Sequence, residues 1–197
     1  MQTGSFEKIN GIAEVDETFI GGKSRNMHLS KRAEKITGPG GKDKTIVIGV
    51  LERSDENVSK ARGAIVPDRS RASLDGYVRE NVEAGSTVYS DALQSYSALG
   101  NLYEHETIDH AESYVNGQVH TNGIENFWSL LKRGLNGTYI SVEPYHLFRY
   151  LDERMYAFNN RDATDLGRFA GVLSAVSGRR LTWLEVTGKL NDEPSCP

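Results

Sequence analysis

The chain has 197 residues, enough to bury one sizeable core, so we expect a single domain with at most a small appendage. Hydrophobic residues make up 38%, and no apolar run approaches the roughly 18–20 residues of a membrane span, which argues against a membrane protein and a signal peptide. The single cysteine, Cys196, excludes a disulfide framework or a cysteine-based zinc site within one chain. A cytoplasmic protein is expected.

The net charge is −4, from 23 basic and 27 acidic side chains, and lacks the basic excess typical of nucleic-acid-binding domains. Residues 23–44 depart from this average, with seven Lys or Arg and two acids. They form either a solvated loop or a surface that attracts a phosphate backbone. The candidate DNA-binding residues there are Lys23, Arg25, Lys31, Arg32 and Lys35.

The first part of the chain predicts a three-stranded meander. Residues 11–20 alternate between apolar and polar positions, as in a half-buried strand, with Asp16 on the polar side. Residues 45–51 are rich in β-branched side chains and predict a central strand, and a third strand is expected near 58–66.

Helices then alternate with strands. The expected elements are a helix over 70–81, a strand over 86–90 ending on Asp91, a helix over 92–99, a strand over 102–108, a helix carrying Glu125, a longer helix within 142–160 and two short helical stretches within 165–190. This order predicts an α/β fold, a ribonuclease H-like mixed five-stranded sheet with helices on both faces and a C-terminal helical extension. In such a sheet the first and fourth strands are parallel neighbours, so Asp16 and Asp91 should meet.

Three acidic motifs carry candidate metal ligands. They are V-D-E-T-F-I-G-G-K at 15–23, Y-S-D-A at 89–92 and H-T-N-G-I-E-N-F-W at 120–128, with the carboxylates Asp16, Asp91 and Glu125. Hard cations take oxygen ligands, and two Mg²⁺ ions about 3.5–4 Å apart can activate the attacking oxygen and stabilise the leaving oxygen of a phosphodiester. We therefore interpret the three acids as a site for two Mg²⁺ ions, with Mn²⁺ as a substitute.

Structural explanations compete with this interpretation. Asp16 could be an exposed acid of the strand's polar face, which is how we interpret Glu14 and Glu17. Asp91 could cap the helix that follows it. Glu125 could form a capping box with Asn122.

Lys132 lies seven residues after Glu125, almost on the same side of a helix. It could hold a DNA phosphate. Alternatively, Lys132 and Arg133 could form a favourable pair at a helix C-terminus before Gly134. His120 is interpreted as a hydrogen-bonded structural group.

The acidic motifs, together with Y-E-H-E-T-I-D-H at 103–110 and Y-L-D-E-R-M-Y-A-F-N-N-R at 150–161, closely resemble the catalytic domain of ISXO-like insertion-sequence transposases over roughly residues 10–161. The resemblance implies an Asp-Asp-Glu (DDE) enzyme of ribonuclease H-like fold. Such an enzyme uses Mg²⁺ to nick DNA at the ends of the element and to join the freed 3′-OH to target DNA.

On this mapping the catalytic, metal-binding acids are Asp16, Asp91 and Glu125, and Lys132 is the accompanying lysine. Some relatives place an asparagine near the third position, so Asn122 is the alternative there. Lys132 and Arg133 join the candidate DNA-binding residues. The expected division is a catalytic domain over 1–161 and a helical extension with a tail over 162–197.

The implied partners are DNA, as transposon ends and target, and further copies of the chain in the DNA complex, with no membrane and no small-molecule substrate. Full members of the family carry an N-terminal zinc-ribbon or helix-turn-helix region, whereas about ten residues precede the first strand here, which suggests a truncated or split product. Two other functions stay open: a ribonuclease H-like nuclease or resolvase, and a non-catalytic DNA-binding or dimerisation fragment. Acting on DNA would place the protein with the nucleoid of a bacterial-type cell.

Overall fold

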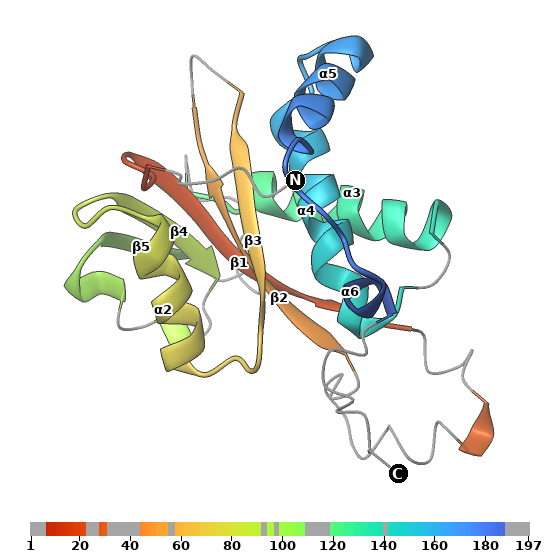
Figure 1. Ribbon diagram of the computed structural model, residues 1–197. Helices are drawn as coiled ribbons and strands as arrows, with labels where there is room; N and C mark the ends of the chain where they lie inside the picture. Colours follow the sequence, from red (N-terminus) through yellow and green to blue (C-terminus); the bar gives the residue numbers. More distant parts are fainter. Residues whose placement is uncertain are drawn as a thin grey trace.

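The sheet has the topology expected from the sequence. The computed structural model describes residues 7–22, 28–30, 44–54, 58–91, 94–96, 99–108, 119–139 and 142–187. Its strands are β1 (Ile12–Ile20), β2 (Thr45–Glu52), β3 (Lys60–Val66), β4 (Thr87–Asp91) and β5 (Glu104–Ile108). They form one mixed sheet in the order β3-β2-β1-β4-β5 (Figure 1). The first three pair antiparallel as a meander, whereas β4 is parallel to β1 and β5 is parallel to β4, which is the ribonuclease H-like arrangement.

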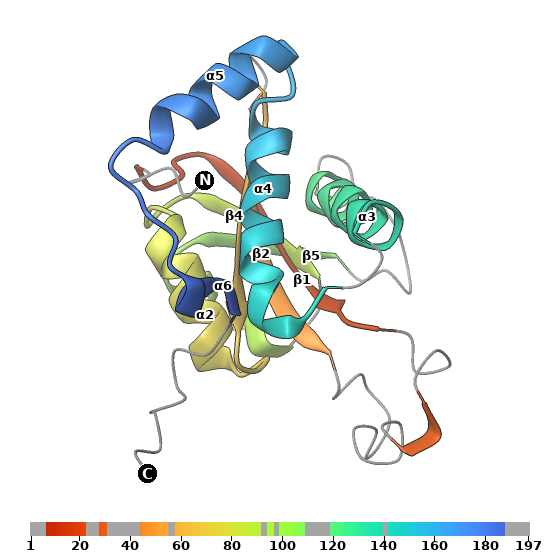
Figure 2. The same cartoon turned by 45° about the vertical axis from the view of Figure 1, so that its right-hand side comes forward.

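Helices cover both faces of this sheet. Helix α2 (Arg71–Asn81) lies on one face, and α3 (Asn122–Gly137) and α4 (Leu147–Asn159) lie on the other (Figures 1 and 2). Each face has its own apolar core, one that joins Leu74 of α2 to the sheet and one that joins Leu131 of α3 to it. The central strand β1 is therefore enclosed between two helical layers.

This enclosure changes the expected character of β1. The alternation of its residues predicts one buried and one solvated face, but Glu14 is only 1% exposed and Thr18 only 4%. The polar side of the strand faces α3 rather than water. The interpretation of Glu14 as an exposed acid is therefore wrong.

The segment after β4 also differs from expectation. In place of an α-helix over 92–99, its described residues form two 3₁₀ turns, η2 (Gln94–Tyr96) and η3 (Leu99–Asn101). Tyr96, the last residue of η2, and Leu99, the first residue of η3, are both buried. Asp91 is the last residue of β4, and the described part of 92–99, residues 94–96 and 99, contains no α-helix.

Helix α3 begins and ends elsewhere than expected. Its N-cap is Thr121, and Asn122 is the first helical residue, so the proposed capping box between Asn122 and Glu125 is wrong. The helix continues through Gly134 to Gly137, which removes Lys132 from the last turn. At Gly134, the guanidinium of Arg154 in α4 takes the place of a side chain, since a Cβ there would lie 2.8 Å from Arg154 Nε.

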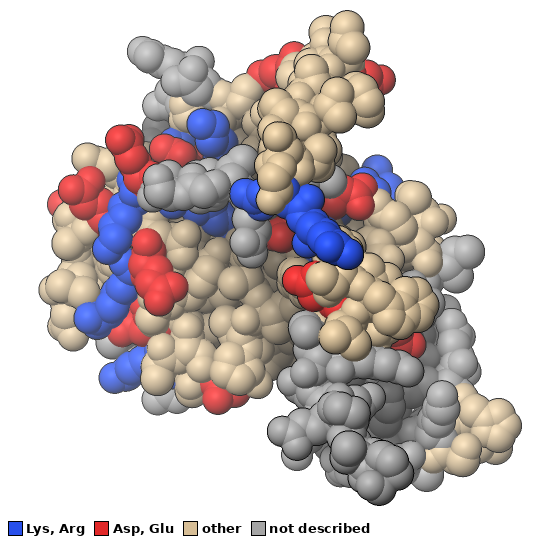
Figure 3. Space-filling view, viewed as in Figure 1, with Lys and Arg blue, Asp and Glu red and all other residues tan. Residues whose placement is uncertain are grey.

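The C-terminal helices α5 (Asp165–Ala175) and α6 (Trp183–Thr187) lie outside the core. Neither contains a buried residue, and apolar side chains such as Phe169 and Trp183 are 64% and 74% exposed. The surface of α5 is largely uncharged in the space-filling view (Figure 3). None of the helices in the described ranges combines the length and apolarity needed to cross a membrane.

Candidate active site

The pairing of β1 with β4 brings two of the three candidate acids together. In the parallel register Val15 lies opposite Ser90, so Asp16 and Asp91 are the next residues on the two strands. Glu17, which follows Asp16, joins them. One carboxylate oxygen from each of Asp16, Glu17 and Asp91 lies within 4.8 Å of the others, in a group that could hold a metal ion.

Asp16 and Glu17 are fixed from opposite faces of β1. Asp16 faces α3, where Trp128 Nε1 donates a hydrogen bond to Asp16 Oδ2 at 3.0 Å. Glu17 faces the other way, and its carboxylate accepts from the Tyr96 hydroxyl at 2.9 Å and from Arg69 Nη1 at 3.4 Å. The Asp91 carboxylate, at the end of β4, lies close to both of them.

The cluster is electrostatically unfavourable without a cation. Burial raises the pKa of Asp16 to about 7, and the negative charges of Glu17 and Asp91 add to this rise. Burial also raises the pKa of Glu17, against the hydrogen bonds from Tyr96 and Arg69. Three carboxylates that repel one another and offer only oxygen ligands suit a hard divalent cation.

The third acid comes from the first turn of α3. Glu125 is exposed, and Thr121 Oγ1 donates to its Oε1 at 2.9 Å. It lies three residues before Trp128 and is therefore its neighbour on the helix surface. Among the described residues, the acids within 4.8 Å of one another are Asp16, Glu17 and Asp91, and Glu125 is outside that group.

Helix α3 approaches β1 and β2 closely because of a glycine. The indole of Trp128 lies over Gly49 of β2, where a Cβ would be 2.5 Å from Trp128 Cζ2 and 2.9 Å from Ile124 Cδ1. No side chain larger than hydrogen fits at this position without displacing α3. Gly49 therefore allows the indole to reach Asp16.

The candidate DNA-binding residues fall into two groups. Lys132 and Arg133 are both exposed on α3, and Arg133 also lines a cavity of about 350 Å³ between α3 and α4. On the face shown in Figure 3, basic and acidic side chains of the described residues lie side by side. The candidates outside the described residues are Lys23, Arg25, Lys31, Arg32 and Lys35.

The roles of two acids, Glu17 and Glu14, were not predicted from the sequence. Glu17 was assigned with Glu14 to the exposed acids because nothing else in the sequence supported a further acid near the metals. Its place directly after Asp16, next to the parallel pair with β4, is the signal that could have identified it. Glu14 is buried and paired with Arg53, whose Nε donates to Glu14 Oε1 at 2.5 Å. No sequence motif predicts that pair.

Comparison with known proteins agrees with this geometry. Residues 8–159 match the model of the ISXO2-like transposase domain. The chain belongs to this family. The resemblance inferred from the sequence is therefore confirmed, and a DDE family implies a divalent metal, for which the acidic cluster provides ligands.

Two curated relatives are similar to the chain. An uncharacterized transposase-like protein of Haemophilus influenzae is 33% identical over 104 residues, which cover 52% of this chain and 84% of the relative. An uncharacterized protein in transposable element ISH50 of Halobacterium salinarum is 29% identical over 139 residues, 65% of this chain. The matched region spans 46% of that second relative.

Proposed function

We propose that this protein is a DDE transposase that cleaves DNA at the ends of an insertion sequence and joins the freed 3′ ends to target DNA. The observation that carries the proposal is the meeting of Asp16, in the middle of β1, with Asp91, at the end of the parallel strand β4. Membership of the ISXO2-like family supports the same chemistry. The DNA would be the transposon ends and the target, handled by more than one copy of the chain.

Asp16 and Asp91 would hold the cations, Mg²⁺ with Mn²⁺ as a substitute, and Glu125 would add the third acid from α3. Glu17 offers a further oxygen in the same group. A pair of such ions activates the attacking oxygen and stabilises the leaving oxygen of a phosphodiester. Asn122, exposed at the start of α3, is the alternative source of the third ligand.

The protein's contribution is to fix these oxygens before DNA binds. Trp128 orients Asp16 by its hydrogen bond to Oδ2, and its ring shields that side of the carboxylate from water. Tyr96 and Arg69 orient Glu17 in the same way from the opposite face. Groups held in place in this manner need no rearrangement during the reaction, which lowers its barrier.

Lys132 is the candidate phosphate contact. Its side chain is exposed on α3 almost directly along the helix from Glu125, seven residues earlier. An ammonium at this place would attract the strand whose phosphate approaches the carboxylates. This contact would be independent of base sequence.

Strand joining with pre-nicked duplexes tests the proposal, with substrate ends taken from the DNA on either side of the gene. We expect joining that requires Mg²⁺ or Mn²⁺ and that Asp16→Asn, Asp91→Asn or Glu125→Gln each abolish, while circular dichroism shows a folded protein. Asp162→Asn, at an exposed position, is the matched control and should join normally. Wild-type joining by Asp91→Asn would overturn the site.

The same assay separates the other candidates. Cleavage without joined product would identify a nuclease. Loss of joining in Asn122→Ala with full activity in Glu125→Gln would transfer the third role to Asn122.

A further inference from the structure

We infer that Glu14, supported by Arg53, is a positioning residue that seats the first turn of α3 on β1 and so fixes the position of Glu125. Its link to catalysis depends on the role proposed above for Glu125. We do not propose Glu14 as a metal ligand, because the described acids whose carboxylate oxygens lie within 4.8 Å of one another are Asp16, Glu17 and Asp91.

The first turn of α3 has no cap of its own. Thr121 occupies the N-cap position, but its side chain makes no capping bond and its hydroxyl instead donates to Glu125. The first amides of a helix have no acceptor within it. The third of them, Ile124 N, donates to Glu14 Oε2 at 2.8 Å. A carboxylate from the neighbouring strand thus acts as the cap, where its charge also interacts favourably with the helix dipole.

A glycine makes this contact possible. A Cβ at Gly123 would lie 2.8 Å from Glu14 Oε2 and 3.0 Å from Leu51 Cδ2. Any larger residue at position 123 would therefore displace either the carboxylate or the helix and disturb their contact.

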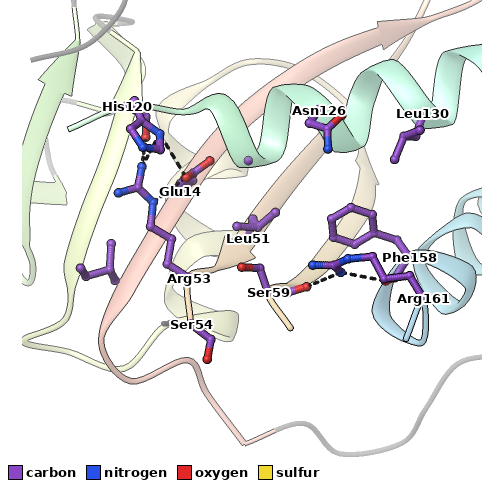
Figure 4. Close-up of a pocket in the computed structure, with 12 residues that line it drawn as sticks. Glu14, Leu51, Arg53, Ser54, Ser59, His120, Asn126, Leu130, Phe158 and Arg161 are labelled. Carbon is purple, nitrogen blue, oxygen red and sulfur yellow. Dashed lines mark hydrogen bonds and ion pairs between the residues drawn. The ribbon is translucent and has the colours of Figure 1, made fainter. Parts of the chain in front are cut away.

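Arg53 offsets the free-energy cost of burying the Glu14 carboxylate. A carboxylate that is 1% exposed needs a partner of opposite charge, and Arg53 Nε supplies it. Arg53 Nη2 also donates to the carbonyl oxygen of His120 at 2.6 Å and contacts its Nδ1, which must be the acceptor because a guanidinium can only donate. Figure 4 shows Arg53 between Glu14 and His120 at the start of α3, on the wall of a cavity of about 600 Å³. Arg53 thus holds both the cap and the segment that leads into the helix.

Two hydrogen bonds then fix α3 to one strand. Glu14 holds Ile124, and Asp16 holds Trp128. Two residues along a strand span about 6.6 Å, and four residues along a helix span about 6 Å, so the two spacings match. Attachment at two points restricts both sliding and rotation of the helix. Glu125 lies between those points.

Gly123→Ala tests the inference without removing any carboxylate. Its matched control is Gly137→Ala in the same helix, where nothing lies within 4 Å of the added Cβ. Helix propensity alone would make both variants more helical. We expect instead that hydrogen exchange of peptide 121–128, measured without metal or DNA, becomes at least tenfold faster in Gly123→Ala only, while peptide 45–52 is unchanged.

Strand joining is measured on the same proteins at a temperature where circular dichroism shows them folded. Gly123→Ala should lower the joining rate at saturating DNA at least tenfold with little change in DNA affinity, and Gly137→Ala should behave as wild type. Glu14→Gln, which keeps the shape but loses the charge that pairs with Arg53, should show both effects more weakly. It also serves as the test if Gly123→Ala does not fold.

Each result has one interpretation. Exchange in peptide 121–128 that matches the Gly137→Ala control in both test variants would overturn the attachment. Faster exchange with wild-type joining would overturn its role in placing Glu125. A wild-type protein that joins no strands would refute the proposed function instead, and the exchange measurement would still decide the attachment.

Discussion

Trp128 donates its indole N–H to Asp16 across 3.0 Å, so the helix that carries the third candidate acid is bonded to the strand that carries the first. The bond is possible because Gly49 lacks a side chain beneath the indole. Packing on this side of the sheet therefore also determines how the carboxylates are arranged, and substitutions in the core should alter the site.

Asp16→Asn should stabilise the metal-free protein, and more so at high pH. The folded protein raises the pKa of Asp16 from 3.8 to about 7, so the stability that this group contributes is present below about pH 4 and is lost as the pH rises through 7. Asparagine does not ionise, so Asp16→Asn should not lose stability in this way as the pH rises. The advantage of the variant should widen by about 1–3 kcal/mol between pH 5 and pH 8.

Urea unfolding in chelator at the two pH values measures this difference. Asp162→Asn, at an exposed position, should leave the pH dependence unchanged. Parallel curves for wild type and Asp16→Asn would show that burial and the neighbouring charges do not raise the pKa of Asp16 in the folded protein.

Glu17→Gln should weaken metal binding. It removes one of three negative charges around a common centre, and we expect about a tenfold loss of Mn²⁺ affinity, or about 1.4 kcal/mol, by calorimetric titration. Tyr96→Phe keeps the charge of Glu17 and removes only its hydrogen bond, so its effect should be smaller. Glu83→Gln is the exposed control. Unchanged affinity in Glu17→Gln would mean that Glu17 serves only Tyr96 and Arg69.

Gly49→Ala should destabilise the protein through Trp128. The added Cβ would lie 2.5 Å from the indole, and overpacking of this kind costs about 1–3 kcal/mol. In a Trp128→Phe background, where the larger ring is absent, the same change should cost at least about 1 kcal/mol less. A double-mutant cycle by chemical denaturation measures this coupling, with Gly76→Ala, which meets nothing within 4 Å, as the control. If the free-energy costs of Gly49→Ala and Trp128→Phe are additive, the destabilisation by Gly49→Ala does not arise from a clash with the Trp128 ring.

Lys132→Ala should weaken DNA binding in a salt-dependent way. Loss of one phosphate contact should reduce the slope of log affinity against log salt by about one. Fluorescence anisotropy with a labelled duplex at several salt concentrations gives this slope. Lys60→Ala, exposed at the first position of β3, should leave the slope unaltered if Lys132 makes a specific contact. Equal effects of the two changes would indicate diffuse attraction only.

The sheet and its central pair could be predicted because they depend on order and register. A meander followed by alternating helices allows few topologies, and these place Asp16 beside Asp91. Asp16 lies in the middle of β1 and Asp91 ends β4, and the parallel register of the two strands, rather than their exact boundaries, brings the aspartates together.

Other parts could not be predicted because they depend on long-range packing. The burial of Glu14 arises from α3 lying on the polar side of β1, which no local pattern of the strand reveals. Tyr96 and Leu99, in the 3₁₀ turns found where a helix was expected, both enter the core, and such tertiary contacts are not visible in a local pattern. Glu17 joins the site through Asp91, a residue distant in sequence.

Glu14, Asp16 and Glu17 lie within four consecutive positions of β1, and strand alternation directs Glu14 and Asp16 to the face covered by α3 and Glu17 to the opposite face. Gain or loss of a single codon among these positions would exchange the faces and leave a gene product inert even though it still encoded every acid. The spacing Glu-x-Asp-Glu, more than the mere presence of acids, is therefore a criterion for separating working copies of such a mobile element from decayed ones.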